Sequence, residues 1–156
     1  MSPAGKRCPV SGWSGKAVER HTVQALLNVP ALPRLGAGRY WFCPDPACDV
    51  VYFGGDGSRF TTGDVRVRVW QKCAPGDRPI CYCFAESEDS IRAEIASHGR
   101  SRAVDRVRGE IAAGRCACEV RNPRGVCCLG DLIAAVARAE AAQAPAAGTD
   151  TSAGAL

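Results

Sequence analysis

Most of the ten cysteines in this 156-residue chain come in closely spaced pairs. The pairs are Cys43 with Cys48, Cys81 with Cys83, Cys116 with Cys118, and Cys127 with Cys128, whereas Cys8 and Cys73 stand alone. Thiol pairs that converge from separate segments are what a soft metal ion or an iron–sulfur cluster requires, because several thiolates must surround it within bonding distance. We therefore expect the chain to fold around metal ligands.

A disulfide framework is the alternative interpretation of the same cysteines. It needs an oxidising compartment, which a signal peptide with an apolar run of about 7–15 residues usually indicates. The segment from Met1 to Cys8 contains no such run, and the chain has no apolar stretch of the roughly 18 residues that a membrane span needs. Both thiols of a Cys-x-Cys or Cys-Cys pair also lie at nearly one point, which suits bridges across a small fold poorly. We expect a reduced, cytoplasmic protein without membrane insertion, and favour metal ligation over disulfides.

Composition limits the core and the class of partner. With 17 Gly, 10 Pro and few aromatic residues, the core is modest, so bound metal would contribute to stability. Seven of the 20 basic residues lie between Arg100 and Arg124, but acidic residues are interspersed and no aromatic residues alternate with them. This pattern favours a solvated helix surface over a nucleic-acid interface. Docking of an acidic partner protein on this surface is a further alternative.

The N-terminal half of the chain predicts a small α+β unit. Residues 1–16 indicate a loop around Cys8, and a short helix is expected over residues 17–27. Two β-prone runs within residues 39–53 flank the loop that carries one cysteine pair. Residues 65–70 alternate valine with arginine, which predicts a half-buried strand.

The C-terminal half predicts helices with cysteines at their ends. The helices are expected at residues 86–97, 102–113 and 131–142, with Ser87 and Ser101 as N-terminal caps for the first two. Two antiparallel helices bring the segment before the first and the segment after the second to the same end, so six cysteines should lie close together there. The expected division is residues 1–78 as a zinc-knuckle-like α+β subdomain, residues 79–142 as a helical cluster-binding subdomain, and residues 143–156 as a disordered tail.

The arrangement of a Cys-x-Cys and a later cysteine pair around a helix-turn-helix resembles bacterioferritin-associated ferredoxins, which hold a [2Fe–2S] cluster. Three longer stretches of sequence indicate a more specific resemblance. The stretches are Cys-Asp-Val-Val-Tyr-Phe at 48–53, Cys-Tyr-Cys-Phe at 81–84, and Cys-Glu-Val-Arg-Asn-Pro-Arg-Gly-Val-Cys-Cys-Leu-Gly-Asp at 118–131. They are similar to the N-terminal domain of the CopZ family of copper chaperones, over about residues 6 to 138. The resemblance implies one [2Fe–2S] cluster and one zinc ion.

The resemblance also implies which thiols hold the cluster. The family's cluster ligands best match Cys81, Cys83, Cys118 and Cys128, the last because Cys-Leu-x-x-Leu opens a helix in the ferredoxin pattern. Spacing alone establishes only the group of six cysteines and does not select the four ligands. Cys116 and Cys127 are then spare thiols or ligands of another site.

The cysteines of the N-terminal half, Cys8, Cys43 and Cys48, suit zinc. Where a Cys-x-x-Cys knuckle would place its second thiol, this chain has Ser11, so the fourth ligand is open. The candidates are Cys73, His21, Cys116 and Cys127. An unligated group of three thiols is the alternative.

These observations predict a redox protein of metal homeostasis with copper as the first candidate metal. We expect it to pass single electrons to a metal ion or to a metal-handling partner such as a copper chaperone or transporter, without a resident hydrolytic or transferase site. The chain has two histidines, no Ser/His/Asp set, and no phosphate-binding glycine loop. The alternative functions are a cysteine-rich module that binds or senses a soft metal, and a structural adaptor without redox turnover.

Overall fold

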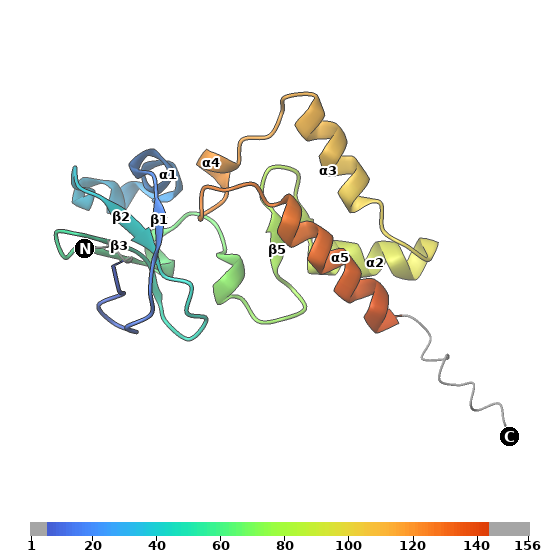
Figure 1. Cartoon of the computed structure of the whole chain (residues 1–156), viewed down its shortest axis with the longest axis horizontal. Helices are drawn as coiled ribbons and strands as arrows, with labels where there is room; N and C mark the ends of the chain where they lie inside the picture. The colour runs from blue at the N-terminus through green and yellow to red at the C-terminus, as the bar shows by residue number, and fades with distance from the viewer. Residues whose placement is uncertain (1–5, 144–156) are drawn as a thin grey trace, which may run out of the picture.

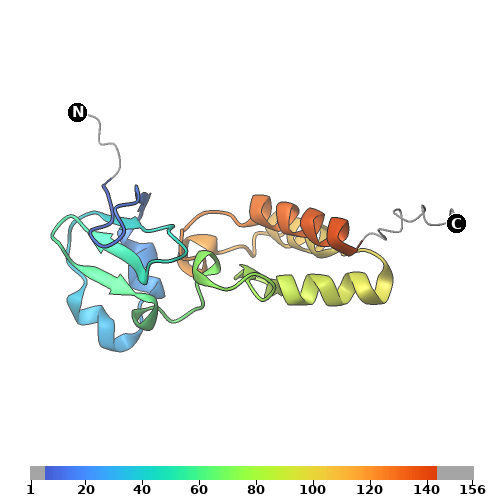
Figure 2. The ribbon, with the colours of Figure 1, turned by 90° about the horizontal axis from the view of Figure 1, so that it is seen from below.

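A computed structural model describes residues 6–143 of the chain. The sheet-containing N-terminal half and the helical C-terminal half lie end to end along the long axis of the molecule (Figures 1 and 2). Helices and antiparallel strands both occur, which agrees with the predicted α+β class. The tail expected from residue 143 onward lies outside the described residues, except for Gln143 at the end of the last helix.

A four-stranded antiparallel sheet organises the N-terminal half, with strand order β1-β2-β3-β4. Its strands are β1 (Lys16–Val18), β2 (Tyr40–Phe42), β3 (Val50–Gly54) and β4 (Arg59–Thr61). The β-prone runs at 39–53 form β2 and β3 as expected, with residues 43–48 as the loop between them. Neither β1 nor β4 was predicted, because three-residue strands are too short to show an alternating pattern.

Helix α1 (Arg20–Leu26) covers one face of this sheet. Its Val23 and Leu26 pack with Tyr40, Phe42 and other buried residues of β2, β3 and β4. The helix begins three residues later than predicted, because residues 16–18 pair with β2 instead. The opposite face of the sheet carries a second, smaller cluster built around three cysteines.

The predicted strand at residues 65–70 is wrong. In this segment Val65 forms an isolated bridge with Leu27, and the residues up to Val69 belong to no strand. The alternation still marks burial, since Val65 and Val69 are buried while Arg66 and Arg68 are exposed. The alternation of valine and arginine therefore marks a half-buried extended segment that pairs with no neighbouring strand. Short 3-10 helices lie before and after it, at Thr62–Asp64 and Trp70–Lys72, and another lies at Val29–Arg34.

The C-terminal half is mainly helical. Strands β5 (Pro79–Cys81) and β6 (Glu86–Ser87) form a two-stranded sheet that precedes helices α2 (Glu88–His98), α3 (Ala103–Ala112), α4 (Cys118–Arg121) and α5 (Leu129–Gln143). The Ser87 side chain caps α2 as predicted. The predicted cap of α3 is one residue too early, because its N-cap is Arg102, whose side chain makes no cap bond; the Ser101 hydroxyl still accepts a hydrogen bond from the Ala103 amide. Both α2 and α3 pack against α5. None of the helices within residues 6–143 is long and apolar enough to cross a bilayer.

The arginines between residues 100 and 124 are partly neutralised by neighbouring carboxylates. The guanidinium of Arg106 bonds to both Glu86 and Glu94, with N···O distances of 2.9 and 2.8 Å. The side chain of Arg115 pairs with that of Glu110. These ion pairs support the interpretation of this segment as a solvated helix surface.

Candidate metal centres

The first centre begins at a tight turn that contains Cys8. The Cys8 amide donates to the Trp13 carbonyl at 2.8 Å, and the Gly12 amide donates to the Cys8 carbonyl at 2.9 Å. Gly12 has a φ of 79°, which a side chain would disfavour. The turn places the Cys8 thiol against the sheet, and Ser11 lies on the same turn.

The other two cysteines of this centre come from the loop between β2 and β3. The side chain of Asp45 accepts a hydrogen bond from the Ala47 amide at 2.8 Å, and its carbonyl accepts one from the Cys48 amide at 3.1 Å. The ammonium group of Lys72 also donates to the Asp45 carbonyl, at 2.7 Å. The loop is therefore held in shape by its own hydrogen bonds and by the charged side chain of Lys72, from the 3-10 helix at Trp70–Lys72.

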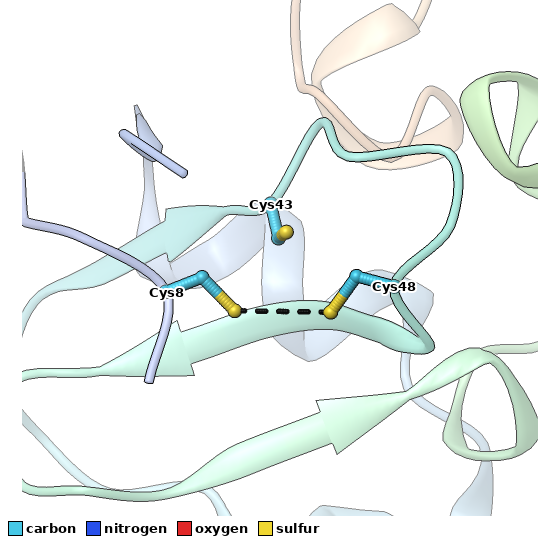
Figure 3. A group of neighbouring side chains, drawn as sticks. All are labelled: Cys8, Cys43 and Cys48. Carbon is cyan, nitrogen blue, oxygen red and sulfur yellow. Dashed lines mark hydrogen bonds between the residues drawn. The ribbon is translucent and has the colours of Figure 1, made fainter. Parts of the chain in front are cut away.

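The thiols of Cys8, Cys43 and Cys48 converge, as Figure 3 shows. All three Sγ atoms lie within 4.8 Å of one another, and those of Cys8 and Cys48 are 3.9 Å apart. Tetrahedral zinc with Zn–S bonds of about 2.3 Å places its sulfur ligands about 3.8 Å apart. The three side chains are almost fully buried, with exposed fractions of 2%, 0% and 7%. Thiols at this spacing and burial fit a zinc ion.

Backbone amides favour the thiolate form of Cys8. Burial raises its pKa, but hydrogen bonds from the amides of Ser11 and Val10 outweigh this effect and lower the pKa to about 7. For Cys48, burial is the largest cause and the pKa is raised, although the Val50 amide donates to its sulfur at 3.4 Å. A metal cation would favour the thiolate form of all three.

None of the four candidate fourth ligands joins this group. Among residues 6–143, no further cysteine, histidine or carboxylate lies within 4.8 Å of all three sulfur atoms. His21 instead faces Glu119, with 3.4 Å between Nε2 and Oε2, and the Cys73 thiol donates to the Val69 carbonyl at 3.2 Å. The hydroxyl of Ser11 lies beside the centre, with its Oγ atom 3.5 Å from the Sγ atom of Cys43.

The second centre lies between the start of the helical half and α5. Cys81 ends β5, Cys83 lies in the turn that follows, Cys118 opens α4, and Cys128 directly precedes α5. Cys81, Cys118 and Cys128 are buried, whereas Cys83 is partly exposed. The helix pair α2–α3 thus brings together segments that are more than thirty residues apart, as its topology predicts.

The thiols of this centre form a connected set. Cys81, Cys118 and Cys128 pack together in one buried cluster, and Cys83 and Cys116 pack against it. The sulfur atom of Cys118 is in turn 3.8 Å from that of Cys83 and 3.6 Å from that of Cys116. Cys127, next to Cys128 in the chain, is exposed. The structure therefore brings Cys81, Cys83, Cys118 and Cys128 together, with Cys116 at their edge.

Amide groups point at the sulfur atoms of this second centre. The Ala117 amide donates to the Cys83 sulfur at 3.2 Å. The backbone amides of Phe84 and Cys83 favour the thiolate form of Cys81 and help to lower its pKa. The pKa of Cys81 is lowered to about 7 and that of Cys118 to about 5. The largest cause in both cases is the neighbouring Cys128 thiol. Four converging thiols with amide donors fit an iron–sulfur cluster, whose sulfur atoms accept such bonds.

Comparison with known proteins assigns the family. A family model described as a zinc binding domain, zf_CopZ, matches residues 5–66. The solved N-terminal domain of CopZ from Archaeoglobus fulgidus superposes with a TM-score of 0.64 at 30% sequence identity, over 83% of this chain and 96% of that domain. The chain belongs to the CopZ zinc-binding domain family. The copper chaperone CopZ of the same organism is 32% identical over 123 residues, which are 78% of this chain and 57% of the chaperone.

The CopZ family assignment confirms the predicted metal binding, because the matched family model is that of a zinc binding domain. The choice of Cys8, Cys43 and Cys48 as the ligands stays a prediction. This chain spans a little over half of the length of the copper chaperone that it resembles. The second centre lies beyond the region that the family model matches, and the [2Fe–2S] cluster stays a prediction. The contact of Lys72 with the Asp45 carbonyl had no counterpart in the sequence analysis, because no residue pattern marks the backbone carbonyl that a distant lysine reaches.

Proposed function

We propose that this protein binds zinc through Cys8, Cys43 and Cys48, and binds a [2Fe–2S] cluster through Cys81, Cys83, Cys118 and Cys128. We further propose that it acts in metal homeostasis by passing single electrons to a metal ion. The observation that carries the cluster proposal is the packing of Cys81, Cys118 and Cys128 in one buried cluster, with the Cys83 sulfur 3.8 Å from that of Cys118.

The surroundings of the second centre suit electron transfer to an external acceptor. When bound, a [2Fe–2S] cluster supplies one-electron redox chemistry, which is what reduction of Cu(II) to Cu(I) needs. Cys83 is partly exposed, and the neighbouring Val126 and Cys127 are exposed, so this side of the centre reaches the surface. An acceptor can therefore approach without any movement of α2 or α5.

Copper is proposed as the acceptor because the similar protein of Archaeoglobus fulgidus is a copper chaperone. The partners of the present chain would then be Cu(II) itself, or a copper chaperone or transporter that takes up the Cu(I) product. Such a partner would bind near the exposed residues Val126 and Cys127.

The test is Cu(II) reduction by protein that has been reduced with dithionite and freed of excess reductant. The wild type should form about one Cu(I) per cluster, detected with a Cu(I)-specific chelator. Cys81→Ser should lose both the visible absorption and the Cu(I) formed. The matched control is Cys127→Ser, which alters an exposed thiol and should retain both. Equal Cu(I) formation by wild type and Cys81→Ser would contradict the proposal.

A second candidate function is thiol-only binding of a soft metal. The sulfur atoms of Cys83, Cys116 and Cys118 all lie within 4.8 Å of one another, which suits a three-coordinate soft ion such as Cu(I). This function predicts tight Cu(I) binding by colourless protein and its loss in Cys116→Ser. The electron-transfer proposal instead predicts that Cys116→Ser keeps the cluster.

A further inference from the structure

The fourth side of the first centre is formed by a serine. The Ser11 hydroxyl lies 3.5 Å from the Cys43 sulfur, on the turn that also carries Cys8. It also accepts a hydrogen bond from the Trp13 amide at 3.2 Å. Residues 1–5 and 144–156 contain no cysteine or histidine, so the ends of the printed sequence hold no fourth thiol or imidazole either.

The side of the centre next to Ser11 is also the side open to solvent. Ser11 is partly exposed, whereas the three cysteines are buried. Its neighbours on the turn, Val10 and Trp13, are 58% and 47% exposed. A Cβ atom added at Gly12 would meet no other atom within 4 Å, so nothing packs over this part of the turn. A small molecule or a side chain of another protein can therefore reach the centre at Ser11.

We propose that the first centre is a three-thiolate zinc site with an open fourth position at Ser11, and that an external thiolate can occupy this position. The inference rests on the zinc binding in the proposed function and specifies its chemistry. Zinc sites closed by four protein ligands are structural, whereas sites with three protein ligands keep a position for an exchangeable ligand. A neutral hydroxyl or a water molecule is a weaker ligand for zinc than a thiolate, so either is readily displaced.

The exchange is a ligand substitution without redox change. An incoming thiol loses its proton to solvent as its sulfur bonds to zinc, and the hydroxyl of Ser11 or a water molecule leaves. Zinc remains Zn²⁺ throughout. The same open position allows a partner with its own cysteine ligands to take zinc from Cys8, Cys43 and Cys48 one ligand at a time.

The chain offers a direct test at position 11. Wild type, Ser11→Cys and Ser11→Ala are loaded with zinc, and the rate of zinc release to a coloured chelator is measured. The Cys43→Ser variant gives the background from other thiols. Ser11→Cys should release zinc more slowly than wild type, on the order of tenfold or more, because a fourth thiolate closes the site. Ser11→Ala should still bind zinc and release it at least as fast as wild type.

A second measurement does not depend on the variants. The zinc in wild-type protein is replaced with Co(II), and 2-mercaptoethanol is titrated in while the sulfur-to-cobalt absorption is recorded. The open site predicts that this absorption rises, whereas in Ser11→Cys it should stay constant.

An unchanged wild-type spectrum, or equal zinc release by wild type and Ser11→Cys, would overturn the open position while leaving zinc binding intact. Loss of zinc binding in Ser11→Ala would also overturn it. Wild-type protein that takes up no more zinc than Cys43→Ser would overturn the zinc site itself.

Discussion

The phenol of Tyr52, in the inner strand β3 of the sheet, donates a hydrogen bond to the carbonyl of Pro123, in the loop that follows α4. Burial raises the pKa of Tyr52 well above its usual value, so the donor stays protonated. A second bond joins the same regions, from the Thr22 hydroxyl to the Glu119 carbonyl at 2.6 Å. The N-terminal and C-terminal halves are thus connected through the segment between Cys118 and Cys128.

Removal of this connection should weaken the fold without loss of metal ligands. Tyr52→Phe leaves the Pro123 carbonyl without its donor and should lower the free energy of unfolding by about 1–3 kcal/mol. Urea denaturation of the zinc-loaded protein measures the change. The zinc content should be unchanged, because Tyr52 contacts α1 and its neighbours on the sheet rather than the three-cysteine cluster. A fall in zinc content would contradict this separation.

Gly125 lies at the same junction and permits close approach of the two halves. It has a φ of 70°, and a Cβ atom there would lie 2.9 Å from Oγ1 of Thr22. Gly125→Ala should therefore combine backbone strain with displacement of Thr22 and cost about 2–3 kcal/mol of unfolding free energy. Gly114→Ala is the matched control, since its φ is 77° but nothing lies within 4 Å. Equal costs for both substitutions would mean that the contact with Thr22 is unimportant.

The ion pairs of Arg106 predict a loss of stability in acid. Hydrogen bonds from Arg106 are the largest cause that lowers the pKa of Glu94 from 4.5 to about 2. A carboxyl with a lowered folded-state pKa stabilises the fold above its unfolded-state pKa, so this contribution is present above about pH 4.5 and is lost as the pH falls toward 2.

Glu94→Gln should remove this contribution. Arg106 is half exposed, so we expect a loss of about 0.5–1 kcal/mol at pH 6 and a smaller difference from wild type at pH 3. Unfolding free energies across this range measure it. Asp105→Asn, at an exposed position on α3, is the control and should show no such trend. A Glu94→Gln effect that is the same at both pH values would contradict the role of the charge.

Sequence patterns located the elements that have strong local signals. Ser87 caps α2 because of a local capping signal, and antiparallel topology of the helix pair brings Cys81 and Cys83 to Cys118 and Cys128. The predicted strand at 65–70 failed for a different reason. Alternation indicates which side chains are buried, but a strand also needs a partner, and Val65 finds only Leu27.

For the metal centres too, sequence patterns predicted only what local spacing determines. The grouping of Cys8 with Cys43 and Cys48 was predictable from cysteine spacing and the turn residues between them. The absence of His21 and Cys73 from the group was not, since a ligand from a distant segment is placed by tertiary packing. The proximity of Ser11 to Cys43 is likewise a property of the folded turn, although its position three residues after Cys8 indicated where to look.

The proposed function requires that one chain holds both a zinc ion and a [2Fe–2S] cluster. Its most direct test is metal and sulfide analysis of anaerobically purified protein, with visible and EPR spectra recorded on the same sample. We expect about two iron and two sulfide per chain, about one zinc, and an EPR signal that appears on dithionite reduction. Colourless protein that holds only zinc after attempted cluster reconstitution would contradict the claim.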